Sequence, residues 1–369
     1  MKNIIRKKKL KTITVGMLLL ISLCLISLTV AAADNGYKGD KPLTTYKHDT
    51  TTGDLCFSHG DSSPSGKLYN TDGPYTVNHQ VTLPTGASVE FARLYNYWTW
   101  SASGTTGVYP TMELTLGGNT ISPDEQYDDR KGFEPYNYPA GTWAYDVTSC
   151  ITDSGTYTTT IVNSNSDPAN YVCINGVGLL IVYSDTNGQQ IEYWVNEGAD
   201  MLSTMDTSGG VTAEEATTIS QFSGSVDLNS VGNARLWTVV QSGGDEDNKL
   251  IFNAADWTGV YDGTPYSDLD IDEARDVTSH LVANDNIAKI QAAPPNPGDY
   301  LMPSNAFLVI AASGDWREEW MGENSDGGTA VTTSELQCAI HHWLDDIPVR
   351  DHVLSTEDLQ EVIVVWLSE

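Results

Sequence analysis

The sequence predicts a mainly β protein: two tandem jelly-roll-like β-sandwiches that arose by internal duplication, followed by a small two-helix module. Three observations support this class. Short apolar runs alternate with clusters of Gly, Pro, Asn, Asp and Ser, several sequence blocks recur in the same order, and helical periodicity begins only after residue 330. The first pattern is typical of short antiparallel strands, and a recurring series of blocks indicates a repeated structural unit.

The recurring blocks define two units. The matching pairs are residues 91–98 with 233–240, 146–151 with 276–281, 167–173 with 296–302, and 177–184 with 306–313. Both copies of the first block contain Ala-Arg-Leu, and both copies of the second begin Asp-Val-Thr-Ser. We therefore place sandwich unit 1 at residues 45–187, sandwich unit 2 at 188–322 and the helical module at 328–369.

Two further features of the blocks concern the fold. Gly178 to Ser184 and Phe307 to Ser313 are nearly continuous apolar runs, as expected of central strands that are covered on both faces. The Asp and Thr of each Asp-Val-Thr-Ser block favour a capped turn into a short helical segment. The recurring Arg93 and Arg235 are expected to pair with buried carboxylates, because Arg is sparse in this acidic chain.

The N-terminus predicts export. A basic segment precedes an apolar run from Val15 to Val30, and Ala31 and Ala33 fit a cleavage site, so residues 1–33 read as a signal peptide. An uncleaved anchor is the alternative, because the stretch from Val15 to Ala33 is nearly long enough to span a bilayer. In either case the sequence predicts an extracellular or cell-surface location, with no membrane contact beyond this segment.

The mature chain is strongly acidic. Six of the 19 Lys and Arg residues lie in the leader, which leaves 13 against 49 Asp and Glu and a net charge near −36. Such a surface repels nucleic acid and anionic lipids, so neither is an expected partner. It attracts cations or suits a salty medium that screens self-repulsion.

Export permits disulfide formation. Cys150 aligns with His280 and Cys173 aligns with Met302, so both cysteines are missing together from the second unit. This joint absence predicts a Cys150–Cys173 disulfide.

Aromatic side chains are the candidate ligand-binding residues. Strand alternation places Tyr95 and Tyr97 on one face and Trp98 and Trp100 on the other, so one face is core and the other is available for stacking on sugars. A similar pair occurs in the second unit. The candidates are Tyr95, Tyr97, Trp98, Trp100, Tyr193 and Trp194. The alternative is that all of them are core and interface aromatics.

Acidic side chains are candidates for calcium binding. Asp268, Asp270 and Asp272 alternate along one segment, and hard oxygen ligands suit Ca²⁺. Asp61 and Asp200 recur at matching places in the two units. No other cofactor is expected. The alternative is that these carboxylates simply point into water.

Signatures of enzymes are missing from the sequence. It contains no G-x-S-x-G, H-E-x-x-H, C-x-x-C or phosphate-binding glycine motif. The chain is therefore expected to have a binding or structural role with a carbohydrate or protein ligand. The alternative is a secreted polysaccharide-acting hydrolase, because a glycosidase needs only two carboxylates.

The C-terminal module repeats a helix pattern. Residues 331–344 resemble residues 354–367, and each copy begins with a capping box: Thr332 with Glu335, and Ser355 with Asp358. Apolar stripes run along both helices, and their predicted core residues are Leu336, Ile340, Trp343, Leu359, Ile363 and Trp366.

This duplicated loop and helix resembles a dockerin from Asn324 onward. Asn324, Asp326, Thr332 and Glu335 fall at calcium-ligand positions of the first loop, whereas Ile347 and Val349 replace carboxylates in the second. Only Asp351, Ser355 and Asp358 fit there. The resemblance implies a dockerin relative that has largely lost calcium and that binds another extracellular protein.

The layout as a whole resembles archaeal, chiefly methanogen, secreted surface proteins that carry a large β-rich domain of unknown function ahead of a short helical module. The segment from Ile347 to Ser355 is of the kind found in that module. This resemblance covers most of the mature chain and implies a surface protein without assigning catalytic residues.

Overall fold

The computed structural model describes residues 36–132, 137–186, 188–205, 211–263, 268–295, 298–314, 316–322, 325–349 and 353–368. The predicted signal segment lies outside these residues. Within the described part of the chain, no helix is long and apolar enough to cross a membrane.

The first unit contains eight main strands that form two sheets. One sheet has the order β1-β11-β4-β9, and a smaller one has the order β3-β10-β6-β7. The strands are β1 (Thr44–Ser58), β3 (Tyr75–Val81), β4 (Ser88–Ser103), β6 (Met112–Leu116), β7 (Asn119–Ile121), β9 (Ala140–Asp146), β10 (Gly155–Asn163) and β11 (Asn170–Ser184). Short additions are β2 (Lys67–Tyr69), β5 (Thr106–Gly107) and β8 (Glu125–Asp129).

The second unit repeats this arrangement. Its sheets have the orders β12-β20-β15-β18 and β14-β19-β16-β17. The strands are β12 (Gln189–Glu197), β14 (Thr217–Ser225), β15 (Val231–Gln241), β16 (Lys249–Phe252), β17 (Ala255–Thr258), β18 (Leu269–Asp276), β19 (Asn284–Gln291) and β20 (Tyr300–Ala312), with a short β13 (Leu202–Ser203).

The strand order identifies the fold. In both units the first, eighth, third and sixth main strands form one sheet, and the second, seventh, fourth and fifth form the other. This is the connectivity of a jelly roll, in which eight antiparallel strands fold into two facing sheets. The predicted fold class, a duplicated jelly-roll-like sandwich followed by a helical module, is therefore confirmed.

The two units share one sheet, which the sequence did not predict. The long strand β1 pairs with β12 through Thr44–Gly53 and with β11 through Gly53–Ser58, so the larger sheets of both units join into a single 12-stranded sheet. Gly53 lies at the changeover, and a side chain there would meet the Tyr183 carbonyl oxygen at 1.9 Å. Such a strand, shared between two sheets, joins their hydrogen-bond networks.

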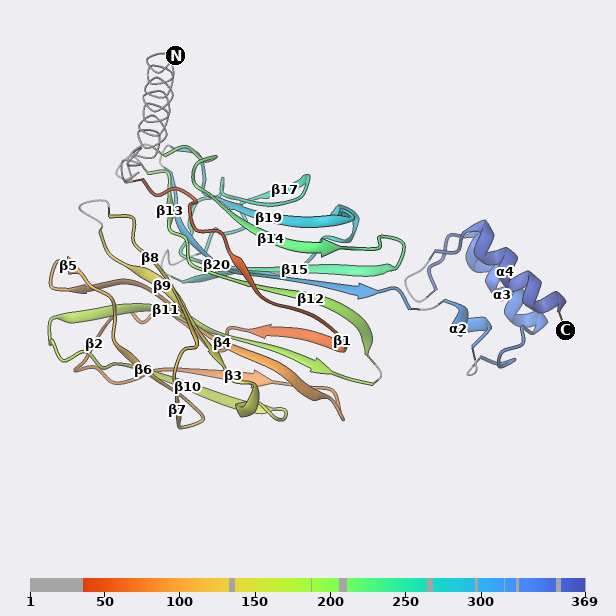
Figure 1. Ribbon diagram of the computed structural model, residues 1–369, viewed down its shortest axis with the longest axis horizontal. Coiled ribbons are helices and arrows are strands. Elements are labelled where there is room, and N and C mark those ends of the chain that lie inside the picture. Colours follow the sequence, from red (N-terminus) through yellow and green to blue (C-terminus); the bar gives the residue numbers. More distant parts are fainter. Residues whose placement is uncertain are drawn as a thin grey trace, which may run out of the picture. The chain divides into compact units, whose positions relative to one another are not determined.

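The sheets stack in four layers, with each small sheet on the outside and the two halves of the large sheet facing each other (Figure 1). Separate apolar cores fill each jelly roll. A third core, which includes Phe57 and Phe307 with ring centroids 5.4 Å apart, lies between the two halves. The central strands are therefore buried on both faces, as their continuous apolar runs predicted.

The C-terminal module has its own small core. It contains α2 (Arg317–Trp320), α3 (Thr333–Leu344) and α4 (Thr356–Leu367). Leu336 and Leu359 are buried in this core, whereas Ile340, Trp343, Ile363 and Trp366 are partly buried against it. The other buried residues of this core are Trp316, Trp320, Val331, Ala339, Val349, Leu354 and Val362.

Candidate functional site

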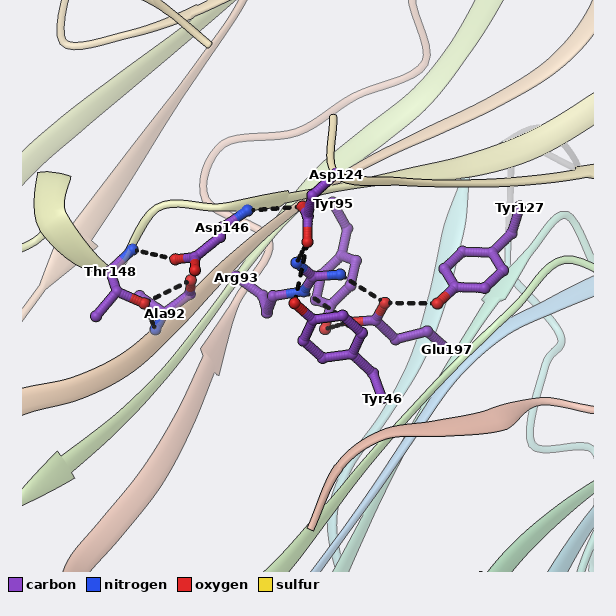
Figure 2. A network of polar contacts seen from close by, with 9 residues as sticks. All are labelled: Tyr46, Ala92, Arg93, Tyr95, Asp124, Tyr127, Asp146, Thr148 and Glu197. Atoms are coloured by element: carbon purple, nitrogen blue, oxygen red, sulfur yellow. Dashed lines mark hydrogen bonds and ion pairs between the residues drawn. The ribbon is translucent and has the colours of Figure 1, made fainter. Parts of the chain in front are cut away.

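A buried ion pair joins the two jelly rolls (Figure 2). Arg93 of β4 and Glu197 of β12 are both fully buried, and the guanidinium donates two hydrogen bonds of 2.8 Å to the two carboxylate oxygens. Tyr95 and Tyr127 donate their hydroxyls to the same carboxylate at 2.8 and 3.1 Å. Each carboxylate oxygen of Glu197 thus accepts two hydrogen bonds, as a buried charge requires.

The remaining guanidinium atoms of Arg93 are also satisfied. Its Nη1 lies 2.5 Å from Asp124 Oδ2, and the Tyr46 ring stacks on it with the centroid 3.7 Å from Cζ. Burial raises the pKa of Tyr46 to about 12, against the opposing effect of the Arg93 charge. Burial also raises the pKa of Tyr95 well above its usual range. The hydroxyls of Tyr46 and Tyr95 therefore stay protonated near neutral pH, and the network links the two units.

The second unit makes a reciprocal contact. Arg235 of β15, the counterpart of Arg93, donates through Nη2 to Asp54 of β1 at 2.5 Å. Each duplicated Arg therefore reaches a carboxylate on the first strand of the other unit. The expected pairing with a buried carboxylate holds fully for Arg93 and less fully for Arg235, because the Arg235–Asp54 pair is about one-third exposed.

The Asp-Val-Thr-Ser blocks form the predicted turns. Asp146 accepts a hydrogen bond from the Thr148 N–H at 2.9 Å, and Asp276 accepts one from the Thr278 N–H at the same distance. Both threonine hydroxyls then accept from the N–H of the alanine beside the duplicated Arg. These blocks stabilise the strand ends, and their role is structural.

Most of the predicted aromatic platform is buried. Tyr95, Tyr97, Trp98, Tyr193 and Trp194 are all at most 2% exposed, so they cannot stack on a ligand. The prediction was wrong because it left one face of each strand open, whereas both faces of the large sheet are covered. Tyr95, Tyr97 and Tyr193 fill the core between the units, and Trp98 and Trp194 fill the two jelly-roll cores.

Trp100 is the exception, because it is 40% exposed and stacks on Tyr138 with centroids 5.7 Å apart. Its φ of 50° is rare for a bulky residue. Ser242 occupies the corresponding place, seven residues after the duplicated Arg, and has a φ of 59°. The unusual backbone is therefore a duplicated feature of the fold.

The Lys131 side chain lies at the centre of an acidic cluster. Carboxylate oxygens of Asp40, Asp129 and Asp200 lie within 4.8 Å of one another, a spacing that could hold a metal ion. However, the Lys131 ammonium lies 2.5, 2.9 and 2.9 Å from these three carboxylates. The ammonium supplies the cation, so Asp200 is a member of a buried ion-pair cluster rather than a calcium ligand. Burial raises the pKa of Asp200 to about 6.

Asp61, the counterpart of Asp200, has a different role. It lies in the loop after β1 and accepts hydrogen bonds from the backbone and side chain of Asn78 at 2.6 and 2.9 Å. The bonds from Asn78 lower the pKa of Asp61. The two recurring aspartates are thus a loop cap and an ion-pair partner, and the structure does not bring them together.

The alternating aspartates of unit 2 separate into two groups. Asp272 forms a two-point pair with Arg275 at 2.5 and 2.7 Å. Asp270 is only 8% exposed, and burial together with the Asp268 charge raises its pKa to about 7. Burial also raises the pKa of Asp268. Asp268 and Asp270 therefore remain candidates for a site, and Asp272 does not.

The predicted Cys150–Cys173 disulfide is wrong, and both residues are free cysteines. Cys173 lies opposite Thr99 on β4, whereas Cys150 follows the end of β9, where Asp146 pairs with Arg93. Thr99 and Arg93, which mark the places of the two cysteines along β4, are themselves about 20 Å apart at 3.3 Å per residue. A disulfide requires Cα atoms within about 7 Å. The absence of both cysteines from unit 2 therefore did not mean that Cys150 and Cys173 lie close together in unit 1.

The helix starts are held by hydrogen bonds. Both predicted capping boxes are present, at Thr332 with Glu335 and at Ser355 with Asp358. In the first loop, Glu335 accepts from the N–H groups of Gly327 and Thr332 at 3.2 and 2.7 Å. Glu335, which the dockerin resemblance places at a calcium-ligand position, therefore accepts hydrogen bonds from the backbone. Asp326 is exposed, and Asn324 and Asp351 lie outside the described residues.

Sequence reasoning missed the roles of Glu197 and Lys131. Glu197 lies three residues before Asp200 in a block that was recognised as a repeat, so a buried charge could have been sought there. Lys131 is one of few basic residues in the mature chain, and its scarcity was the available signal. The contacts of Glu197 with Arg93 and of Lys131 with Asp200 join positions 104 and 69 residues apart in sequence, and no local pattern reveals them.

Comparison with known proteins establishes the family. The family described as "Protein of unknown function (DUF3344)" matches residues 36–311, which include both jelly rolls, so the chain belongs to that family. No curated protein matches. The solved structures that are similar include the major capsid protein P2 from bacteriophage PM2, with 9% identity over 71% of this chain and 99% of that chain and a TM-score of 0.19. Another is a protein of Sulfolobus Turreted Icosahedral Virus, with 12% identity over 70% and 90% and a TM-score of 0.20. Sequence identities and TM-scores this low give no basis for assigning the roles of those proteins to this chain.

Proposed function

We propose that this chain is an extracellular surface protein whose joined jelly rolls form a rigid body and whose C-terminal helix pair binds a partner protein. The observation that carries the proposal is the unusual exposure of large apolar residues on the helical module. Leu344, Val353, Val364 and Leu367 are 64, 47, 64 and 68% exposed. Such a concentration of apolar surface is typical of an interaction site.

The exposed residues lie outside the small core of the module. Leu344 and Leu367 are the last residues of α3 and α4. Val364 is exposed, whereas the neighbouring Val365 packs partly against the core. The two short helices do not contain enough residues to cover all of their own apolar surface.

The negative charge of the module and of the chain indicates which kind of partner protein can bind. The module carries acidic residues at Asp345, Asp346, Glu357 and Glu361, and the whole mature chain is near −36. A second copy of this chain would bring like charges together, which costs free energy. We therefore commit to a different protein with an apolar groove rimmed by Lys and Arg.

The test compares two sets of apolar substitutions in the full chain, expressed in its native cells. We expect the variant Leu344→Ser, Val364→Ser, Leu367→Ser to move from the cell envelope into the medium. The control variant Ile219→Ser, Leu228→Ser, Val282→Ser changes equally exposed residues on the jelly rolls and should remain on the envelope. Equal distribution of both variants, or retention of both, contradicts the docking role. Recovery of unmodified leader inside the cells contradicts the extracellular location.

A hydrolase is the second candidate function. It is favoured by one observation, the raised pKa of Asp270 beside Asp268, because a carboxyl with a pKa near 7 can act as a general acid. The test is release of reducing ends from polysaccharides by the mature protein. The hydrolase requires that Asp270→Asn abolish the release, and no activity on any polysaccharide in a broad panel removes this candidate.

A further inference from the structure

Asp270 of β18 and the partly exposed Asp268, which precedes this strand, each have a carboxylate oxygen without a hydrogen-bond partner in the described part of the chain. Asp270 is nine-tenths buried, and its Oδ2 has no hydrogen-bond donor among the described residues. The Oδ1 of Asp268 is likewise buried and without a donor. An unpartnered, buried carboxylate is costly unless a proton or a cation neutralises it, so the free Asp270 oxygen indicates that one of the two is present.

Two glycines make room for these oxygens. A side chain at Gly263 would meet Asp270 Oδ1 at 2.0 Å and Asp268 Oδ1 at 3.0 Å. A side chain at Gly243 would meet Asp270 Oδ2 at 2.6 Å and the Tyr261 carbonyl oxygen at 2.7 Å. The carboxylate oxygens therefore converge within a few ångström of one another, close against backbone that only glycine permits.

The surroundings are acidic and well held. Asp262, Asp245, Glu246 and Asp247 line an adjoining pocket of about 430 Å³. The backbone beside it is fixed by Asn248, which donates to the Tyr261 carbonyl at 2.7 Å and accepts from the Tyr261 N–H at 3.1 Å. A rigid frame that holds converging oxygens is what an oxygen-liganded cation needs.

We propose that Asp268 and Asp270 form a binding site for a hard divalent cation of the Ca²⁺ class. Calcium accepts carboxylate and carbonyl oxygens in flexible numbers, and water can complete its coordination from the adjoining pocket. This site goes beyond the docking function and does not depend on it. It differs from the Asp40, Asp129 and Asp200 cluster, where Lys131 already neutralises the carboxylates.

The duplication provides an internal comparison. Asp270 lies opposite Val240 on β15, and the corresponding pair in the first unit is Gly141 opposite Trp98 on β4. The fold of this strand pair therefore forms without a carboxylate. Asp270 is an addition specific to the second unit rather than a requirement of the jelly roll.

The experiment is calorimetric titration of CaCl₂ into the chelator-treated mature full chain. KCl is present at about 0.5 M, so that diffuse attraction to the acidic surface is screened. We expect one saturable site, weakened at least roughly tenfold by Asp270→Asn and by Asp268→Asn. The matched control is Glu273→Gln, which removes one exposed charge from the same strand and should bind as the parent does.

Thermal melting of the same proteins shows whether each variant is still folded. Asp270→Asn removes a buried charge, so in chelator it should melt no lower than the parent, and Ca²⁺ should raise the melting temperature of the parent and of Glu273→Gln alone. Uptake that never saturates, or a saturable site that survives in both Asp variants, overturns the proposal. A site lost equally in Glu273→Gln overturns it too, because surface charge alone would then explain binding.

Discussion

Arg93 and Glu197 lie 104 residues apart in sequence, yet the guanidinium of one makes a two-point hydrogen bond to the carboxylate of the other, and both are fully buried. The pair bridges the third strand of unit 1 and the first strand of unit 2. A buried charge left alone is strongly unfavourable, so each residue needs the other. The contact therefore ties the two copies of the duplicated fold into one body.

The first prediction removes one partner. Arg93→Met should lower the free energy of unfolding by about 3–5 kcal/mol, because Glu197 would remain buried without its cation. The double variant Arg93→Met, Glu197→Met should recover much of that loss, since no uncompensated charge remains. Urea unfolding of the mature chain measures both.

Arg235→Met is the matched control. Its pair with Asp54 is about one-third exposed, so screening by water should limit the cost to about 1 kcal/mol or less. If Arg93→Met and Arg235→Met lowered the free energy of unfolding equally, burial of the Arg93–Glu197 pair would add no stability beyond that of an exposed pair.

The duplication was predictable because it leaves a local record. The Ala-Arg-Leu and Asp-Val-Thr-Ser blocks keep their order, and their residues perform the same task in both units, as the Asp146 and Asp276 turns show. The strand shared between the units was not predictable, since nothing in the residues of β1 states which strand pairs with each end. The covered second face of the large sheet follows from that pairing, and it is why the tyrosines were misjudged.

The residue types of the candidate sites were visible in the sequence, but their pairing was not. The alternating aspartates drew attention to Asp268 and Asp270, which remain candidates, but Asp272 pairs with Arg275, and a bulge at Ala274 changes the register of β18 between them. Lys131 makes the Asp200 cluster an ion-pair cluster instead of a metal site. Hydrophobic periodicity indicates neither the bulge nor the contact between Lys131 and Asp200.

A second prediction concerns salt. Residues 34–369 carry 13 Lys and Arg against 49 Asp and Glu, a net charge near −36, and crowded carboxylates repel one another through water. Molar KCl screens this repulsion, because the Debye length falls to about 3 Å. We expect the melting temperature of the mature protein to be higher in molar KCl than in dilute buffer. Calorimetric scans at both salt concentrations in the presence of chelator would disprove this if the two transitions coincide.

A third prediction concerns pH and Asp200. Burial raises its folded pKa to about 6 from 3.8, so between these values the folded state binds more protons than the unfolded state. The stability that this group contributes is therefore present below pH 4 and is lost as the pH rises through 6. Its full size is about 3 kcal/mol at 1.36 kcal/mol per unit.

The test compares the parent with Asp200→Asn, which does not titrate there. Free energies of unfolding measured at intervals from pH 4 to pH 7 should fall more steeply in the parent. Asp61→Asn provides a control of opposite sign, because hydrogen bonds from Asn78 lower the pKa of Asp61 and its contribution is lost as the pH falls. Parallel pH profiles for the parent and Asp200→Asn would refute the assignment.

The last prediction concerns what holds the helical module together. Helices of 12 residues are too short to persist alone in water, so α3 and α4 depend on their shared core and capping boxes. Trp343 and Trp366 pack partly against that core, and truncation of either should unfold the pair. Glu335 is already engaged by Gly327 and Thr332, so calcium is not needed to close the first loop. Hydrogen exchange of the amides in α3 and α4 of the full chain should be unchanged by a chelator and should accelerate strongly in Trp343→Ala and in Trp366→Ala. Trp100→Ala, which removes an exposed Trp from a jelly roll, should leave exchange in both helices as it is. If the chelator accelerates exchange while the two helical Trp variants stay protected, a metal ion and not the apolar core stabilises this module.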